Sequence, residues 1–164
     1  PDDLDIQNQK IILRLDLNVP IKNKIIIDDT RIRLCLPFLK KLINILKKRK
    51  IRISLFIEPN LKDINEAKNL NADCIEIHTG KICNLINMNK NFTNELKRIK
   101  KAVKEGNKLG LEVHAGHGLT FKSAHILTKV KGIEEFNIGH FLIGESIFEG
   151  MSSVIKTFKK ILKS

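Results

Sequence analysis

EVHAGHGL, at residues 112–119, alternates apolar and polar side chains and ends in a glycine-rich turn that carries a histidine. Two other strings have the same pattern: IEIHTGK at 75–81 and IEEFNIGH at 133–140. Alternation with a period of two is typical of a β-strand, and the functional groups of α/β barrels lie where strands end in loops. All five histidines and all nine glycines lie at or beyond residue 78. We therefore expect the chemistry of this chain at three strand ends.

Strands and helices are expected to alternate along the whole chain. Strands are predicted at 11–19, 51–59, 74–78, 111–115 and 133–138, with a short additional one at 24–28. Helices are predicted after the N-cap candidates Asp28, Asp29 and Thr30, then at 61–70, between Phe92 and Gly110, at 122–129 and at 146–162. Such alternation is typical of parallel βαβ units. A complete TIM barrel takes about 250 residues, so 164 residues predict an α/β fold, a partial TIM barrel with about five mostly parallel strands.

The chain is strongly basic, with 30 lysines and arginines against 18 aspartates and glutamates and a net charge of +12. Its densest basic run is at 47–50, followed by Arg52. Aromatic side chains do not interleave with these charges, and a helix-turn-helix pattern is missing, so specific nucleic-acid binding is not indicated. Phosphorylated small molecules are the partners that fit this charge better.

Composition also bears on compartment and cofactors. The sequence has no run of about 18 uninterrupted apolar residues, so we expect no membrane-spanning segment. The three cysteines, Cys35, Cys74 and Cys83, form no CxxC pair and predict neither a disulfide framework nor a zinc ribbon. The N-terminal sequence PDDLDIQ is polar and unlike a signal peptide. We therefore expect a cytoplasmic protein with reduced thiols, without a metal and without a cofactor.

The strand at 74–78 is expected to present two reactive side chains on one face. Side chains alternate between the two faces of a strand, so Glu76 and His78 are expected to point into the barrel. Ile75 and Ile77 then point toward the helices. A carboxylate near a barrel mouth can stabilise a cationic transition state or transfer a proton. It can equally be the buried ion-pair partner of a lysine. The sequence leaves both interpretations open.

His117 lies between Gly116 and Gly118, directly after a predicted strand. Glycines at such a turn let the backbone approach a ligand closely and offer free N–H groups to an anion, and a histidine there is well placed as a general acid or base. The alternative is a histidine that only hydrogen-bonds within the turn. A zinc site built on His114 and His117 together with His78 and His140 is less favoured, because the first pair lies on a strand-to-loop turn rather than on one face of a helix.

Gly139 and His140 follow the last predicted strand and precede an apolar segment that can start a short helix. In barrels, the loops after the last two strands and a short helix N-terminus commonly bind phosphate. Gly118, Gly139 and His140 are therefore the candidates for a phosphate site. His125 falls in a predicted helix and is expected at the surface.

Four strings carry a resemblance to a known family: ISLFIEP, CIEIHTGK, LGLEVHAGHGLT and GIEEFNIGHFLIGESIFEGM. In order and in spacing they resemble the C-terminal half of the pyridoxine 5′-phosphate synthase family, over about residues 50–164. The resemblance implies a TIM barrel, usually a homo-oligomer, and a transferase of vitamin B6 biosynthesis. That enzyme condenses 1-deoxy-D-xylulose 5-phosphate with 3-amino-2-oxopropyl phosphate and closes the pyridine ring with loss of phosphate and water.

The resemblance also implies roles for individual residues. Glu76 matches the glutamate that stabilises the transition state, and His117 matches the histidine that donates a proton. Gly118, Gly139 and His140 match contacts to the phosphate of the aminoketone.

Two positions depart from the family pattern. His114 stands where the family usually has asparagine, and Glu145 stands where a basic residue is common. The strings of the family's first half are absent as well. That half supplies a proton-accepting histidine and glutamate and much of the sugar-phosphate site, so the resemblance implies an incomplete active site in this chain alone.

The N-terminal segment resembles a different family. KIILRLDLNVP at 10–20 and IDDTRIRLCLPFLKKLI at 27–43 are similar to the start of phosphoglycerate kinase. By that resemblance Asp16, Asn18 and Arg31 match contacts to 3-phosphoglycerate. The nucleotide domain of such a kinase has no counterpart in this sequence.

We therefore expect a chimeric chain packed as one domain, in which a kinase-like segment, 1–46, precedes a synthase-like half barrel, 47–164, with the join near residues 44–50. Two alternatives to a synthase stay open at this point. One is a non-catalytic half barrel that binds phosphate or oligomerises, and the other is a kinase fragment that binds 3-phosphoglycerate.

Overall fold

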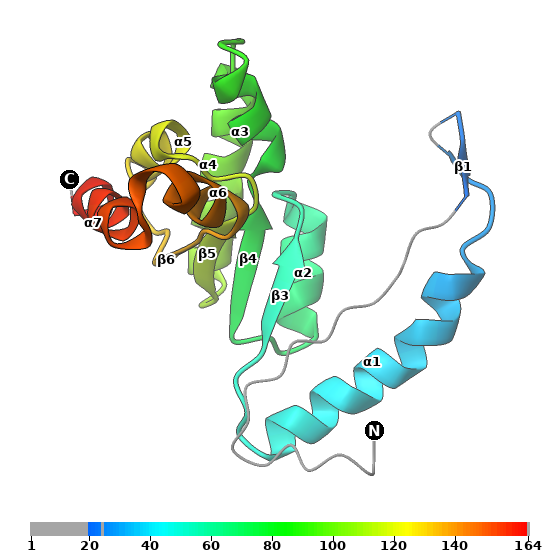
Figure 1. Ribbon diagram of the computed structural model, residues 1–164. Coiled ribbons are helices and arrows are strands. Elements are labelled where there is room, and N and C mark those ends of the chain that lie inside the picture. Colours follow the sequence, from blue (N-terminus) through cyan, green and yellow to red (C-terminus); the bar gives the residue numbers. More distant parts are fainter. Residues whose placement is uncertain (1–19, 24, 164) are drawn as a thin grey trace. The chain divides into compact units, whose positions relative to one another are not determined.

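The computed structural model describes residues 20–23 and 25–163 (Figure 1). Contacts divide the chain into two compact units, residues 1–44 and 45–164. The strand predicted at 11–19 lies outside the described residues.

A two-stranded hairpin and most of a long helix make up the described part of the first unit. Strands β1 (Ile21–Lys22) and β2 (Ile25–Ile26) pair antiparallel, so the strand predicted at 24–28 is confirmed over two residues. Helix α1 (Thr30–Lys48) begins where the N-cap pattern predicted, and Asp28 Oδ1 accepts a hydrogen bond from the backbone N–H of Thr30 at 2.8 Å. The helix continues through Pro37.

A four-stranded parallel sheet forms the centre of the second unit. Its strands, in spatial order, are β3 (Ser54–Ile57), β4 (Cys74–His78), β5 (Glu112–Gly116) and β6 (Glu135–Asn137). The strands follow one another in sequence order and each connection contains at least one helix (Figure 1). The predicted alternation of parallel strands and helices is confirmed, and the sheet is part of a TIM-barrel-like fold. The strands predicted at 51–59 and 133–138 are shorter than expected.

Six helices accompany the sheet: α2 (Leu61–Asn69), α3 (Gly80–Asn87), α4 (Thr93–Lys108), α5 (Phe121–Leu127), α6 (His140–Glu149) and α7 (Met151–Leu162). The sequence reading missed α3 altogether. The single helix predicted at 146–162 is wrong, because Gly150 adopts a φ of +78° and separates α6 from α7. Within the described part of the chain, no helix is long and apolar enough to cross a membrane.

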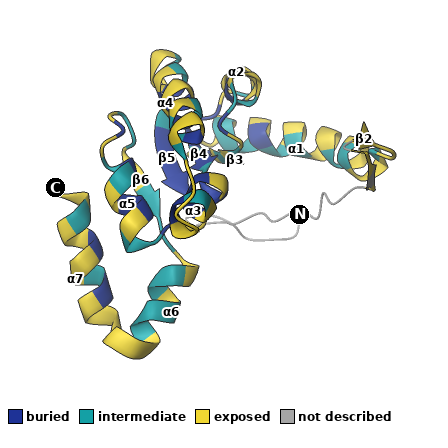
Figure 2. Cartoon of the chain, turned by 90° about the horizontal axis from the view of Figure 1, so that it is seen from above, coloured by how far each residue is buried: buried dark blue, intermediate teal, exposed yellow. Residues whose placement is uncertain are grey.

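The main core lies on one face of the sheet. Ile75 and Ile77 of β4 and Val113 of β5 are fully buried there, in one cluster with side chains of α2 to α5 such as Ile64 and Ile99. Figure 2 shows β4 and β5 as the most continuously buried strands. The alternation of side chains along β4 predicted that its isoleucines point to this face, toward the helices. The other face carries the polar residues of the same strands.

A smaller cluster ties the last helices to α5. Val154 and Phe158 of α7 are buried against it, and the ring of Phe121 lies 4.5 Å from that of Phe158 and 5.0 Å from that of Phe141, between centroids. This aromatic packing fixes α6 and α7 next to α5, after the chain has left the sheet at the end of β6.

Gly106 of α4 offers a test of the packing between helix and sheet. A Cβ there would lie 2.7 Å from Val113 Cγ2 and 3.2 Å from Ile75 Cδ1. We expect Gly106→Ala to lower the free energy of unfolding by about 1–3 kcal/mol through overpacking. Gly144→Ala in α6 is the matched control, because its Cβ would meet open space, and it should raise that free energy by about 0.5–1 kcal/mol. Urea unfolding measures both, and equal gains would contradict the packing described here.

Candidate functional site

A cavity of about 380 Å³ lies toward the C-terminal ends of the parallel strands. Its lining residues are Phe56, Glu76, His117, Gly118, Leu119, Asn137, Gly139 and His140. All five residues predicted as catalytic or substrate-binding for the synthase are among them, although they come from three separate stretches of sequence. The carboxyl ends of neighbouring parallel strands meet at one edge of a sheet, which is why these residues converge.

Glu76 points to the polar face of the sheet, into the cavity, and is partly buried. Asn137, the last residue of β6, donates a hydrogen bond from Nδ2 to Glu76 Oε2 at 2.8 Å. Burial raises the pKa of Glu76, and the hydrogen bond from Asn137 offsets only part of that rise. Among the described residues, no lysine or arginine forms an ion pair with Glu76. The alternative of a lysine ion pair is therefore not what the structure shows.

Gly116 makes the space that the Glu76 carboxylate occupies. The strand register places Gly116 opposite His78 of β4 and opposite Asn137 of β6. A Cβ at Gly116 would overlap the Glu76 carboxylate, with Cδ only 2.7 Å away. Glu76 therefore reaches across β5 to Asn137 because the strand between them has no side chain at that point.

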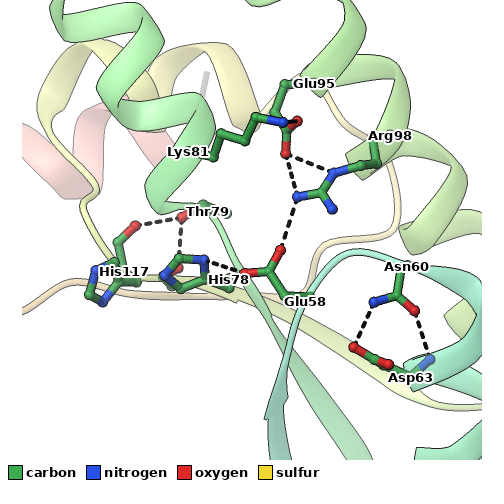
Figure 3. A network of polar contacts seen from close by, with 10 residues as sticks. Glu58, Asn60, Asp63, His78, Thr79, Lys81, Glu95, Arg98 and His117 are labelled. Atoms are coloured by element: carbon green, nitrogen blue, oxygen red, sulfur yellow. Dashed lines mark hydrogen bonds and ion pairs between the residues drawn. The ribbon is translucent and has the colours of Figure 1, made fainter. Parts of the chain in front are cut away.

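His117 follows β5 in a strained turn. Its φ of +78° is a left-handed conformation that costs a non-glycine residue about 1–2 kcal/mol. The buried hydroxyl of Thr79 lies 2.7 Å from the carbonyl oxygen of Gly116 and 2.8 Å from that of His117, so both acceptors share its proton (Figure 3). Strain of this kind concentrates at functional positions, which supports a chemical role for His117 over a purely local one.

Helix α6 begins at the cavity, with Gly139 as its N-cap residue. The first N–H groups of a helix have no partner inside it, and the helix dipole places partial positive charge at that end. A Cβ at Gly139 would have no atom within 4 Å, so the space beside this residue is open. The described residues that line the cavity include neither lysine nor arginine. Among the described lining residues, the start of α6 is thus the source of partial positive charge.

Three further cavity residues, Phe56, Leu119 and Asn137, were missed as site candidates, and two of them lie on strands. Asn137 holds Glu76, and Phe56 of β3 is paired in register with Glu76 and closes one side of the cavity. A signal for both was present in the sequence, because each lies on the same face of its strand as the predicted site residues.

The remaining histidines take other positions. His114 is buried, and its Nε2 lies 2.8 Å from Glu112 Oε1. His125 is exposed on α5, as predicted. Within residues 20–23 and 25–163, no group of three or more histidine, cysteine or acidic side chains is placed to hold a metal ion.

Comparison with known families gives the context of this site. The family model described as "Pyridoxal phosphate biosynthesis protein PdxJ" matches residues 32–164. The chain belongs to the PdxJ family. The match begins inside α1, within the segment that resembles phosphoglycerate kinase. The kinase resemblance itself stays a prediction: Asp16 and Asn18 lie outside the described residues, and Arg31 lies in the first turn of α1.

Curated relatives agree with the family. Pyridoxine 5′-phosphate synthase of Pelagibacter ubique (strain HTCC1062) is 58% identical over 123 residues, which are 75% of this chain and 52% of that protein. Proteins of the same name from Sulfurihydrogenibium sp. (strain YO3AOP1) and Syntrophotalea carbinolica are each 43% identical, over 76% of this chain and 51% and 52% of their own lengths. This PdxJ chain thus spans about half the length of the curated relatives it matches.

The turn at His117 can be tested through Thr79. Thr79→Val removes the hydroxyl whose proton both carbonyls accept, while the Gly116 carbonyl keeps its hydrogen bond from the backbone N–H of residue 79, so we expect a loss of about 0.5–1.5 kcal/mol in the free energy of unfolding. Thr79→Ser keeps the hydroxyl and is the matched control. Chemical denaturation measures both variants, and an equal loss in the two would show that the methyl group and not the hydrogen bond matters.

The raised pKa of Glu76 makes a prediction about stability and pH. A carboxyl whose pKa is higher in the folded state than its ordinary 4.5 destabilises the fold when it ionises. Glu76→Gln should therefore unfold at a higher temperature than the unsubstituted chain at pH 7. The difference should shrink as the pH falls through the raised pKa, and vanish well below 4.5, where both states are protonated. Melting curves over a pH series measure this, and a difference independent of pH would contradict it.

Proposed function

We propose that this chain supplies part of the active site of a pyridoxine 5′-phosphate synthase, which joins 1-deoxy-D-xylulose 5-phosphate to 3-amino-2-oxopropyl phosphate. The observation that carries the proposal is that Glu76, His117 and His140 line one cavity in a member of the PdxJ family. The volume of about 380 Å³ falls within the range of small-molecule sites.

Glu76 is proposed to stabilise positive charge in the transition state. Its carboxylate lies in the cavity, and Asn137 fixes its orientation by a hydrogen bond to one oxygen. A partly buried carboxylate acts strongly on a nearby cation because little water competes with it. The raised pKa also brings Glu76 closer to the range in which it exchanges protons at neutral pH.

His117 is proposed as the proton donor. Its side chain lines the same cavity as Glu76, and the left-handed turn places the ring beyond the end of β5. An imidazole is well suited to give a proton at neutral pH. The phosphate of the aminoketone is proposed to lie at Gly118, Gly139 and His140, where the start of α6 favours an anion.

A homo-oligomer in the cytoplasm is also part of the proposal. Within the described chain, β3 and β6 are the edges of the sheet, and each has one neighbouring strand. Unpaired strand edges favour association with other chains. Association is also a way in which groups outside this half of the barrel can join the site.

The proposal is tested with the purified chain and both phosphorylated substrates. Formation of pyridoxine 5′-phosphate is followed by chromatography, and release of inorganic phosphate in parallel. Glu76→Gln and His117→Asn should each lower turnover by about 100-fold or more, as expected for groups that act in proton transfer or charge stabilisation. His125→Asn, a histidine exposed on α5, is the control and should leave turnover unchanged.

Binding separates the synthase from the alternative of a non-catalytic half barrel. Pyridoxine 5′-phosphate is fluorescent and can be titrated directly by anisotropy. Turnover would exclude the non-catalytic alternative, and saturable binding without turnover would favour it. A chain with neither turnover nor binding would contradict the proposed function.

A further inference from the structure

A series of ion pairs leads to the edge of the cavity. The residues that form it are not among those that line the cavity. The series starts at Glu95 of α4, which is 5% exposed, forms ion pairs with Lys81 Nζ at 2.9 Å and Arg98 Nη2 at 2.7 Å, and accepts a hydrogen bond from Arg98 Nε at 2.9 Å. Burial alone would raise the pKa of Glu95, but the hydrogen bonds from Lys81 and Arg98 outweigh it and hold the pKa below its ordinary value. This end of the series is therefore charged at neutral pH and held in place.

Glu58 links Arg98 to a histidine next to the cavity. Arg98 Nη2 lies 3.0 Å from Glu58 Oε2, and the other carboxylate oxygen lies 3.0 Å from His78 Nδ1 (Figure 3). A carboxylate at this distance attracts the imidazole, so the contact holds the His78 ring on the side of Glu58. The series thus joins α4, the residue after β3 and the last residue of β4.

The ring of His78 lies against the ring of His117. Their centroids are 4.5 Å apart and their planes are inclined by 37°. The edge of Phe56 meets His78 at 5.3 Å between centroids. Gly80 leaves room for the pair, since a Cβ there would lie 2.8 Å from His117 Cδ2 and 2.9 Å from His78 Cε1. The backbone at Gly80 and the ring of His78 therefore both limit where the His117 ring can go.

We infer that His78 is a positioning residue that sets the orientation of the His117 ring, with Glu58 and Arg98 as its support. The left-handed turn determines where the His117 side chain starts, and the contact with His78 determines where its ring points. The catalytic consequence rests on the proposed function, in which His117 donates a proton. A donor must meet the substrate at a suitable angle, and small displacements of such a group cost much of the rate.

The orientation of the His117 ring can be tested without an activity assay. In NMR spectra of the full chain, the ring C–H signals of His117 are assigned by their loss in His117→Asn. We expect His78→Ala to shift these signals, because the ring current of His78 is removed. His125→Ala makes the same substitution at an exposed position and should leave them in place. Unmoved His117 signals in His78→Ala would overturn the inference.

A second variant removes only the support. Glu58→Ala keeps both rings and breaks the contact to His78 Nδ1, so it should also shift the His117 signals. Glu66→Ala, an exposed glutamate of α2, is its matched control. If His78→Ala does not fold, Glu58→Ala decides the inference by the same measurement.

Kinetics then distinguish positioning from a general loss of structure. His78→Ala should lower kcat by about 10- to 100-fold, while KM stays within about twofold. In the His117→Asn background the same substitution should cause no further loss, because His78 acts through His117. An equal loss in both backgrounds would overturn the inference. A chain that forms no product would count against the proposed function alone, because the NMR shift in Glu58→Ala, which keeps both rings and their ring currents, still decides whether His78 positions His117.

Discussion

The parallel pairing of β4 with β5 is the constraint on which the site depends. It sets Glu76 opposite His114 and His78 opposite Gly116. The isoleucines of β4 are fully buried on the other face, beneath the helices. A shift of one residue would turn the carboxylate into the apolar core and the isoleucines toward the cavity. Hydrophobic burial on one face therefore fixes the position of the chemistry on the other.

The alternation in sequence was enough to predict β4 and β5 to within about one residue, because both strands bury one face and carry polar groups on the other. Three helices, α3, α6 and α7, were not predicted correctly, and a glycine is the reason in both regions. Helix α3 begins at Gly80, which reads as a loop residue, but that glycine is needed where the rings of two histidines pass close to the backbone. The apolar run around Gly150 reads as one helix, but a φ of +78° breaks it into α6 and α7.

Much of the site could also be predicted, since functional groups at the ends of parallel strands converge whatever their separation in sequence. The side-chain partners could not. Glu76 is held by Asn137, and His78 by Glu58 and Arg98. These partners lie on different strands and helices, and their distances depend on strand length and on register. The pattern of one strand carries no information about either quantity.

Two unfavourable features meet in the cavity: a carboxyl whose pKa is raised by burial, and a histidine in a left-handed turn. Neither contributes to the stability of the fold, and each needs support from neighbours. Asn137 provides it for Glu76, and Thr79 for the turn at His117. The apolar contacts that stabilise the chain lie on the opposite face of the same strands. The sheet thus separates the residues that hold the fold together from those that strain it, which is the arrangement expected where local rules of stability give way to function. Packing of the core therefore does not explain the strain at Glu76 and His117, because packing alone would favour relieving it.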